Sequence, residues 1–140
     1  YQLEALSPGF GPLERVRAVC CVNVLADHLE RHGTLEAYEG AKRRMLDLAG
    51  PQALAVLSAD DPRVGRWSFA RGRELRFSTR PGVTTGLNVA DGSFRLDTLV
   101  LGALADLRLP GDFQRANMLA ALGLAHALGA RPHELAAAIS

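Results

Sequence analysis

The sequence predicts an α/β protein in which helices flank a parallel sheet and a small antiparallel sheet is attached to it. Residues 16–24 and 53–58 are apolar runs of the kind found in strands buried on both faces. An amphipathic helical pattern fills residues 34–48 between them, and strand–helix–strand is the order of parallel sheets. Beyond residue 67, short strand patterns separated by turn residues precede two more helical segments.

The composition is that of a soluble globular domain. The 140 residues are 48% hydrophobic, and their formal net charge is +1. Such a chain can bury a substantial core, and it is neither polar enough for disorder nor basic enough to indicate a nucleic-acid partner. No apolar run approaches the ~20 residues of a membrane span, and no signal peptide is recognisable. We therefore expect a cytoplasmic protein that binds neither nucleic acid nor membrane.

The first strand pattern contains two adjacent cysteines, Cys20 and Cys21. Neighbouring residues of a strand point to opposite faces and do not readily form a disulfide. We expect both to be reduced thiols that fill space in a cytosolic protein. A metal site would require more cysteines than these.

The first helix is predicted from Thr34, a favourable N-cap, to about Leu48, where a Gly-Pro pair follows. At ~100° per residue its apolar side chains gather on one arc, and charged side chains occupy the opposite side. The second strand, at residues 53–58, follows and is closed by a turn at residues 59–62.

The second half is predicted to begin with short strands at residues 67–79, 84–89, 94–99 and 103–109. Asp91-Gly92 between two of them is a strong hairpin signal, so we expect these strands to form the small antiparallel sheet. A helix is predicted at residues 116–128 with Gly129 at its end, and a final helix from Pro132 through Ile139.

Lys42 is the single lysine among sixteen basic residues, and it falls inside the apolar arc of the first helix. Loss of hydration disfavours the charged form of an amine. A neutral amine can add carbon dioxide and become a carbamate, which behaves as a carboxylate, whereas arginine stays protonated. Lys42 is therefore a candidate functional group. The alternative is a lysine whose stem packs on the core while its head reaches water.

Polar residues follow both buried strands, where α/β proteins place their chemistry. After the first strand, His28 is a candidate metal or substrate ligand that Asp27 could orient, or else a loop histidine bonded to its neighbours. His32 follows at the spacing of two helix-borne ligands, but no third zinc ligand is evident. After the second strand, Asp60 and Asp61 could bind magnesium or act as acid and base, although the following proline favours a turn-opening role for Asp61.

The segment Gly-Asp-Phe-Gln-Arg-Ala-Asn at residues 111–117 opens the long helix. Its last residue, Asn117, could hydrogen-bond the edge of a base, although asparagine is also common in a first helical turn. No glycine-rich phosphate loop occurs in the 140 residues, so the main cradle of any bound nucleoside triphosphate would lie elsewhere.

Taken in order, these segments resemble those of the Mur ligases. The opening Tyr-Gln-Leu-Glu resembles the end of the family's Glu-Xaa-Ser-Ser-Phe/Tyr-Gln-Leu-Glu segment. The strongest match begins at Asn23, includes Asp27-His28, and continues to Tyr38 and Lys42. Ser-Ala-Asp-Asp at residues 58–61 resembles Asn-Xaa-Asp-Asp, and residues 111–117 resemble Gly-Xaa-His-Asn-Xaa-Xaa-Asn. The resemblance thus covers essentially the whole chain.

This resemblance implies a Rossmann-like, P-loop-type parallel sheet and makes residues 1–140 the latter part of the central ATP-binding domain. It implies ATP and Mg²⁺ as cofactors and catalytic roles for Lys42 and His28. Lys42 would be carbamylated and help to hold a magnesium ion. His28, with Asp27 behind it, would bind the second metal or lie against the muramoyl substrate. Asn117 would contact the adenine of ATP.

Within the family, Arg31 and the Gln-Leu-Glu at residues 2–4 favour the members that join D-glutamate to UDP-MurNAc-L-alanine, as monomers, in peptidoglycan precursor synthesis. In that reaction ATP phosphorylates the carboxyl group, and the amine of D-glutamate attacks the acyl phosphate. Two alternatives stay open. One is a sibling ligase of the diamino-acid-adding or folylpolyglutamate synthase type, and the other is a non-catalytic α/β interaction module.

The chain departs from the family pattern in places. Phe113 and Gln114 stand where a His-Asn pair is usual, and Ser58 stands where asparagine is usual. The chain begins at Tyr1 without methionine and stops at Ser140 within a predicted helix, so we expect both ends to be cuts in a longer protein. The N-terminal uridine-binding domain, the phosphate loop and the C-terminal domain would then lie outside it, and the 140 residues alone should not catalyse the reaction.

Overall fold

The computed structural model describes residues 12–25, 33–107 and 111–139. Its strands form one six-stranded sheet in the order β1-β2-β3-β4-β5-β6. The first four strands run parallel to one another, and the last two are antiparallel: β1 (Ala18–Cys21), β2 (Leu54–Ser58), β3 (Arg73–Ser78), β4 (Leu87–Ala90), β5 (Ser93–Leu96) and β6 (Leu99–Ala103). The helices are α3 (Leu35–Leu48), α4 (Asp112–Ala127) and α5 (Pro132–Ala137), with short 3₁₀ turns η1 (Val64–Arg66) and η2 (Leu104–Asp106). The α/β prediction is confirmed.

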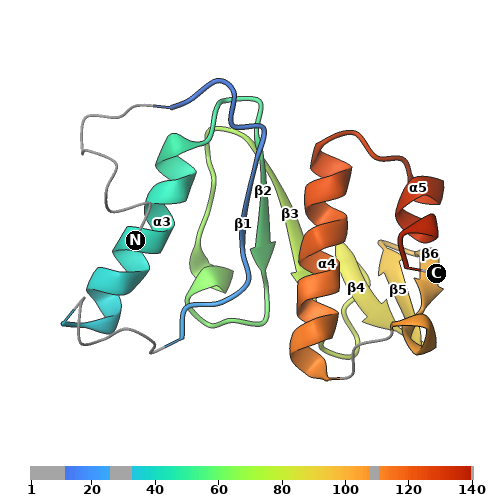
Figure 1. Cartoon of the computed structure of the whole chain (residues 1–140). Helices are drawn as coiled ribbons and strands as arrows, with labels where there is room; N and C mark the ends of the chain where they lie inside the picture. Colours follow the sequence, from blue (N-terminus) through green and yellow to red (C-terminus); the bar gives the residue numbers. More distant parts are fainter. Residues whose placement is uncertain (1–11, 26–32, 108–110, 140) are drawn as a thin grey trace.

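The sheet lies between two helical layers, α3 on one face and α4 with α5 on the other (Figure 1). β2 supplies both cores by strict alternation: Leu54 and Val56 pack on the α4 side, and Ala55 and Leu57 pack on the α3 side. This two-sided burial explains why β2 reads as a continuous apolar run. No helix in the described ranges has the length and apolar character needed to cross a membrane.

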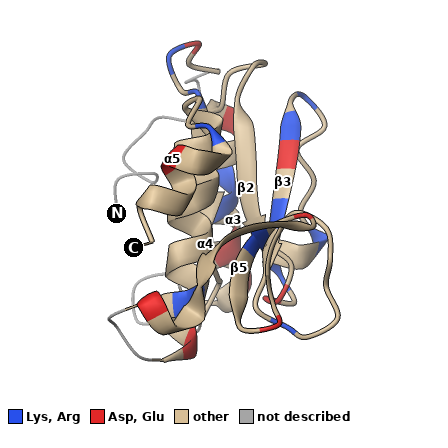
Figure 2. Cartoon of the chain, turned by 90° about the vertical axis from the view of Figure 1, so that its right-hand side faces the viewer, with Lys and Arg blue, Asp and Glu red and all other residues tan. Residues whose placement is uncertain are grey.

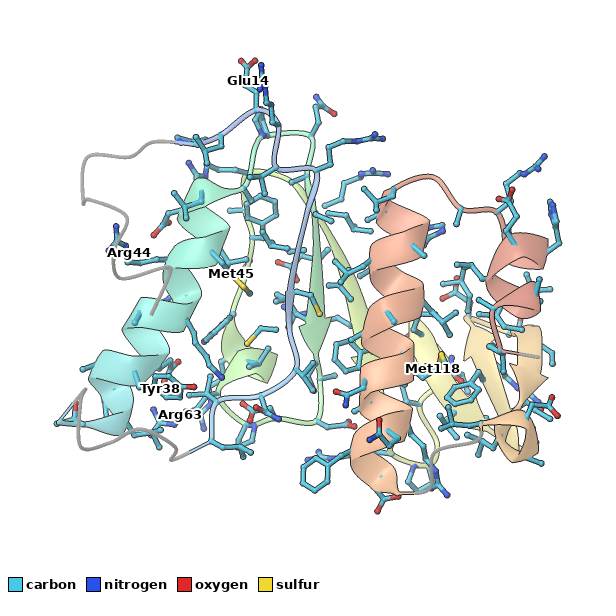
Figure 3. All side chains as sticks on the ribbon, in the orientation of Figure 1. Glu14, Tyr38, Arg44, Met45, Arg63 and Met118 are labelled. Atoms are coloured by element: carbon cyan, nitrogen blue, oxygen red, sulfur yellow. The ribbon has the colours of Figure 1, made fainter. Side chains whose placement is uncertain are left out.

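The first helix and the strands before and after it lie where the sequence predicts them, but only β2 is buried throughout, whereas β1 is half-buried except at Cys21. Thr34 is the N-cap of α3, and its Oγ1 accepts a hydrogen bond of 3.1 Å from the N–H of Ala37. Met45 points from α3 toward the sheet, whereas Arg44 points away from it (Figure 3). The predicted apolar arc is therefore the face that α3 packs against β1 and β2.

An antiparallel part is attached to the parallel sheet, as predicted, but it is smaller than predicted, because β3 and β4 extend the parallel sheet and only β5 and β6 are added in antiparallel pairing. The sequence of β3 resembles that of an exposed strand because β3 pairs with β4 only through Phe77 and Ser78. Among the described strands, β2 alone pairs with the first half of β3, in which Arg73 and Glu74 are exposed and carry the opposite charges seen in Figure 2. Charged residues suit such an unpaired edge. They also make a central strand resemble a solvent-facing one.

The end of the sheet also differs in its boundaries. The Asp91-Gly92 hairpin is confirmed, with positive φ at both residues between paired Ala90 and Ser93. The predicted strand at residues 103–109 is wrong: the strand is β6, at Leu99–Ala103, and η2 follows it. The long helix α4 begins at Asp112 rather than at residue 116, with Gly111 as its N-cap. The final helix starts at Pro132 as predicted and ends at Ala137.

Candidate functional site

The carboxyl ends of β1, β2 and β3 meet at one edge of the sheet, because these strands are adjacent and parallel. Polar residues follow each of them: Asn23 after β1, Asp60 and Asp61 after β2, and Thr79 after β3. A cavity of about 290 Å³, which we call the crevice, opens among these residues and is completed by the start of α4 at Asp112. Open α/β sheets bind ligands at this edge.

The carboxylate of Asp60 connects the end of β2 to the end of β3 by hydrogen bonds. Its Oδ1 accepts a hydrogen bond of 2.5 Å from the hydroxyl of Ser78, and its Oδ2 accepts the N–H of Thr79 at 2.7 Å and the hydroxyl of Thr79 at 2.9 Å. Arg80 lies 3.6 Å from the same carboxylate. Both carboxylate oxygens of Asp60 are therefore engaged in joining the two strands.

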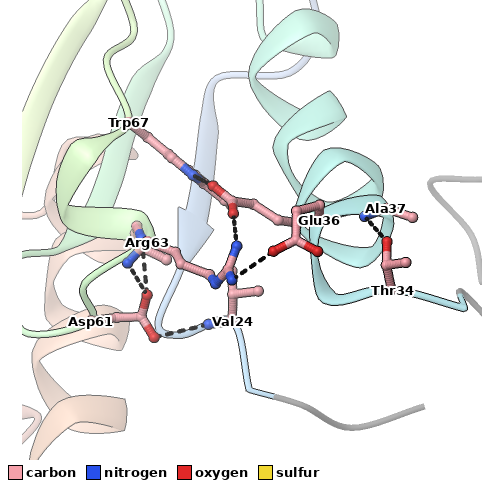
Figure 4. A network of polar contacts seen from close by, with 9 residues as sticks. Val24, Thr34, Glu36, Ala37, Asp61, Arg63 and Trp67 are labelled. Atoms are coloured by element: carbon pink, nitrogen blue, oxygen red, sulfur yellow. Dashed lines mark hydrogen bonds and ion pairs between the residues drawn. The ribbon is translucent and has the colours of Figure 1, made fainter. Parts of the chain in front are cut away.

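Asp61 opens the turn after β2, as the sequence predicts. Its Oδ1 accepts the backbone N–H groups of Arg63 and Val64, each at 2.9 Å (Figure 4). Its Oδ2 reaches across to the N–H of Val24, at 3.0 Å, beyond the end of β1. Asp61 thus fixes both its own turn and the chain that leaves β1, a role that the turn signal does not reveal.

Lys42 projects from α3 toward the end of β1 and is half-buried. Its Nζ donates a hydrogen bond of 2.9 Å to the carbonyl of Asn23 and lies 4.7 Å from the centre of the Tyr38 ring. It lines a second cavity of about 320 Å³, the lysine pocket, together with Asn23, Met45 and both cysteines. The head of Lys42 is therefore held by the protein and beside open space.

Cys20 and Cys21 face opposite sides of the sheet and form no disulfide, as expected. Burial raises the pKa of Cys20 to about 12, and the adjacent Cys21 adds to the increase. Burial also raises the pKa of Cys21 to about 11, although nearby Lys42 acts in the opposite direction. Both thiols are therefore protonated at neutral pH, and Cys21 Sγ donates to the Asn23 carbonyl at 3.5 Å.

A polar network joins α3 to the turn after β2 (Figure 4). Arg63 contacts Glu39 at 2.6 Å and Glu36 at 3.0 Å, and Trp67 Nε1 donates to Glu39 at 2.8 Å. The hydrogen bonds from Trp67 and Arg63 lower the pKa of Glu39. This network was not predicted from the sequence. Its signal was the presence of two glutamates at the i, i+3 spacing on the polar side of the helix.

Two of the predicted site residues lie outside the described part of the chain, namely Asp27 and His28, as does His32. Asn117 is exposed on α4, and the α4 residues that line the crevice are Asp112, Phe113 and Ala116. The structure thus brings Asp60, Asp61 and the start of α4 together, with Lys42 on the other side of the Asn23 segment.

The described residues contain no cluster of three or more His, Cys, Asp or Glu side chains that could hold a metal ion. A carbamate on Lys42 would add an anionic oxygen ligand of the type that Mg²⁺ prefers. The lysine pocket gives the amine room for that group. The lysine pocket therefore has room for such a carbamate, whereas its other lining residues supply no carboxylate ligand.

A model of the Mur ligase middle domain matches residues 11–125 of the chain. The UDP-N-acetylmuramoylalanine–D-glutamate ligase of Pelotomaculum thermopropionicum is 36% identical over 141 residues, which cover 97% of this chain and 30% of that protein. The enzyme of the same name from Shouchella clausii is 37% identical over 115 residues, covering 81% of this chain and 26% of that protein. The chain thus spans less than a third of these relatives.

Solved structures share the fold at lower sequence identity. MurF from Acinetobacter baumannii superposes with a TM-score of 0.68 at 19% identity, covering 88% of this chain and 28% of that one. The UDP-N-acetylmuramate:L-alanyl-γ-D-glutamyl-meso-diaminopimelate ligase of Neisseria meningitides superposes with a TM-score of 0.66 at 21% identity, covering 88% and 39%. At such low sequence identity, the structural similarity shows that the fold is shared.

Proposed function

The chain belongs to the Mur ligase family, and from this we propose that it is the latter part of the central ATP-binding domain of a cytoplasmic ligase that joins D-glutamate to UDP-MurNAc-L-alanine. The observation that carries the proposal is the 36% identity to a protein named for this reaction over 97% of the chain. The activity belongs to a longer protein, because the chain spans only 30% of that relative.

In the proposed reaction, the terminal phosphoryl group of ATP passes to the carboxylate of UDP-MurNAc-L-alanine, which gives an acyl phosphate and ADP. The amine of D-glutamate then attacks the acyl carbon, phosphate leaves, and the amine gives up a proton. Mg²⁺, when bound, would offset the negative charge of the phosphoryl groups. We assign the described edge of the sheet, with the crevice and the lysine pocket, to this site.

Lys42, as a carbamate, would hold the magnesium ion, and His28, oriented by Asp27, would be the second protein ligand or contact the muramoyl substrate. Formation of the carbamate consumes one neutral amine and one carbon dioxide and releases one proton. The room beside Nζ supports this role. We further propose that Asn117 contacts the adenine of ATP from α4, while the phosphates lie against another part of the longer protein.

A sibling ligase is the second candidate, because the solved structures with the same fold carry the names of several different ligases. The relatives with 36% and 37% identity favour the D-glutamate-adding reaction over these siblings. A non-catalytic module is a third candidate, and Phe113, which is 72% exposed at the crevice in place of the family's usual histidine, is the feature that favours it.

The proposal is tested in the longer protein by following phosphate release with UDP-MurNAc-L-alanine, ATP and one amino acid at a time. We expect release with D-glutamate and none with a diamino acid. Lys42→Arg should lower kcat by at least about 100-fold, because arginine keeps the charge but cannot form a carbamate. Arg43→Lys, the opposite exchange at the exposed neighbouring position, should leave kcat unchanged.

Other results point elsewhere. Release only with a diamino acid would identify the sibling ligase. No release with any amino acid, together with no binding of ATP, would favour the interaction module.

A further inference from the structure

The peptide group between Asn23 and Val24 is held at both of its polar ends by charged side chains. Its carbonyl oxygen accepts a hydrogen bond of 2.9 Å from Nζ of Lys42. Its N–H donates a hydrogen bond of 3.0 Å to Oδ2 of Asp61. Lys42 lies on α3 and Asp61 lies in the turn after β2, so one peptide unit connects two segments that are distant in sequence.

This peptide lies after the last residue of β1 that pairs with β2. The pairing of β1 with β2 ends at Cys21, opposite Leu57. Residues 22–25 have no regular secondary structure, so the sheet ladder does not set the orientation of their peptide planes. The direction of the Asn23 carbonyl therefore depends on the side chains that hold this peptide.

Asp61 is well placed to set that direction. Its other oxygen, Oδ1, accepts the N–H groups of Arg63 and Val64, which fixes the carboxylate within its own turn. Hydrogen bonds to a charged partner are stronger than neutral ones, and bonds at the two ends of a peptide polarise each other. Asp61 therefore strengthens the contact between the Asn23 carbonyl and Lys42 as well as aligning it.

We propose that Asp61 is a positioning residue for the amine of Lys42 and acts through the Asn23–Val24 peptide. The carboxylate holds the peptide N–H, the peptide presents its carbonyl, and the carbonyl holds Nζ at the edge of the lysine pocket. The Cys21 thiol donates to the same carbonyl at 3.5 Å and stays protonated at neutral pH.

This arrangement suits carbamate formation, a consequence that rests on the proposed function. The ammonium loses one proton, the neutral amine bonds to the carbon of carbon dioxide, and the nitrogen loses a second proton to solvent. The nitrogen of the resulting carbamate still carries one N–H. That N–H can keep the bond to Asn23, so the new carboxylate is directed away from this carbonyl and into the lysine pocket.

The single lysine allows a direct test by NMR on the 140-residue chain labelled with [¹³C]lysine. The two Hε protons of a held lysine give separate signals, and those of a freely rotating lysine average to one. The test variant is Asp61→Asn. Its remaining oxygen can keep the turn bonds to Arg63 and Val64, while its NH₂ group opposes the N–H of Val24.

We expect separate Hε signals in the wild type and merged signals in Asp61→Asn, with Val24 amide exchange faster by about tenfold. Asp91→Asn is the matched control, because it removes the same charge at an exposed, positive-φ site that asparagine tolerates. It should leave the Hε signals separate. The proposal is overturned if Asp61→Asn speeds Val24 exchange yet leaves the Hε signals as in the wild type.

Should Asp61→Asn fail to fold, Lys42→Met probes the same link from its other end. We expect faster exchange of the Val24 amide in this variant, because its peptide loses the cation on the carbonyl side. An unchanged Val24 exchange rate would overturn the proposal.

The same samples with ¹³C-bicarbonate separate the two proposals. A carbamate signal that falls several-fold in Asp61→Asn supports both of them. A wild type with no carbamate contradicts the carbamate step of the proposed function, and the Hε signals still decide whether Asp61 positions Lys42.

Discussion

Cys20 and Cys21 show how much two adjacent residues can differ in their surroundings. Because they alternate across β1, Cys20 belongs to the α4-side core and Cys21 to the α3-side core. Burial raises the pKa of both thiols, to about 12 for Cys20 and about 11 for Cys21, from an ordinary value of 9.0. Lys42 acts against this increase at Cys21, because its positive charge lowers the pKa of that thiol.

The raised pKa values of these two thiols predict that the protein loses stability in alkaline solution. Below pH 9.0 the thiols are protonated in both the folded and the unfolded states, and their stabilisation is complete. As the pH rises above 9.0, the unfolded state ionises first, so the unfolding free energy should fall by up to ~1 kcal/mol per pH unit for each thiol. Urea unfolding between pH 7 and about pH 10.5 measures this fall.

A Cys20→Ala variant is the comparison for that measurement. Its alkaline decline should be smaller than that of the wild type, because one of the raised pKa values is gone. Equal declines in the two proteins would show that Cys20 does not contribute.

At the scale of elements, α3 is attached to the turn after β2 by charged side chains as well as by its apolar face. Arg63 bonds Glu36 and Glu39 of α3, and Trp67 adds a bond to Glu39. The helix that carries Lys42 is thereby held to the turn that carries Asp61. The positions of these two residues depend on the same attachment.

Glu39→Gln should weaken this attachment in a pH-dependent way. The pKa of Glu39 is lowered in the folded state, so its stabilisation is complete above the ordinary value of 4.5 and is lost as the pH falls below it. We expect Glu39→Gln to cost ~0.5–1 kcal/mol at pH 7, and the difference from the wild type to shrink at about pH 3.5. Thermal unfolding of both proteins at the two pH values measures this.

Glu134→Gln on α5 serves as its control, since the bonds of Glu134 within the described ranges are to Arg131 at the start of its own helix. If Glu39→Gln had no larger effect than Glu134→Gln at pH 7, the network would not anchor α3.

The other layer depends on a close approach of α4 to the sheet. A Cβ on Gly123 would lie 2.5 Å from Cγ1 of Val56, so Gly123→Ala forces the helix and β2 apart. We expect a destabilisation of ~1–3 kcal/mol, measured by urea unfolding. Gly40 lies at an exposed position of α3, where a Cβ would meet nothing within 4 Å. Gly40→Ala should therefore raise the unfolding free energy by ~0.5–1 kcal/mol. A stabilised Gly123→Ala would contradict the close packing.

At the scale of the whole molecule, the crevice is a product of parallel strand order. Three adjacent strands end at one edge, and the two aspartates that follow β2 bond to the chain beyond β1 and beyond β3: Asp61 accepts the N–H of Val24, and Asp60 accepts the N–H of Thr79. The four parallel strands and the two antiparallel strands form one continuous sheet, so the β4–β5 hairpin and the crevice belong to the same sheet.

The isolated chain of 140 residues should show no D-glutamate-dependent ATP turnover, because it contains no glycine-rich phosphate loop to hold the triphosphate. Phosphate release measured with all substrates present, beside the longer protein at the same concentration, is the test. Turnover by the chain alone would mean that the described crevice suffices for phosphoryl transfer.

The sequence by itself determined the elements whose signals are local. The cap at Thr34, the apolar arc of α3, the run of β2 and the Asp91-Gly92 hairpin each depend on neighbouring residues, and each is confirmed. It also singled out Lys42 by its position on the arc and Asp61 by its turn. The roles of Lys42, His28 and Asn117 stay predictions.

Only the tertiary structure decided which strands are neighbours and which side chains meet. The charged first half of β3 looks solvent-facing in sequence, and its parallel place beside β2 follows from pairings between distant segments. The link from Asp61 through the Asn23–Val24 peptide to Lys42 spans 37 and 19 residues of sequence. No local pattern encodes such contacts, because their partners come together only when the sheet and α3 pack.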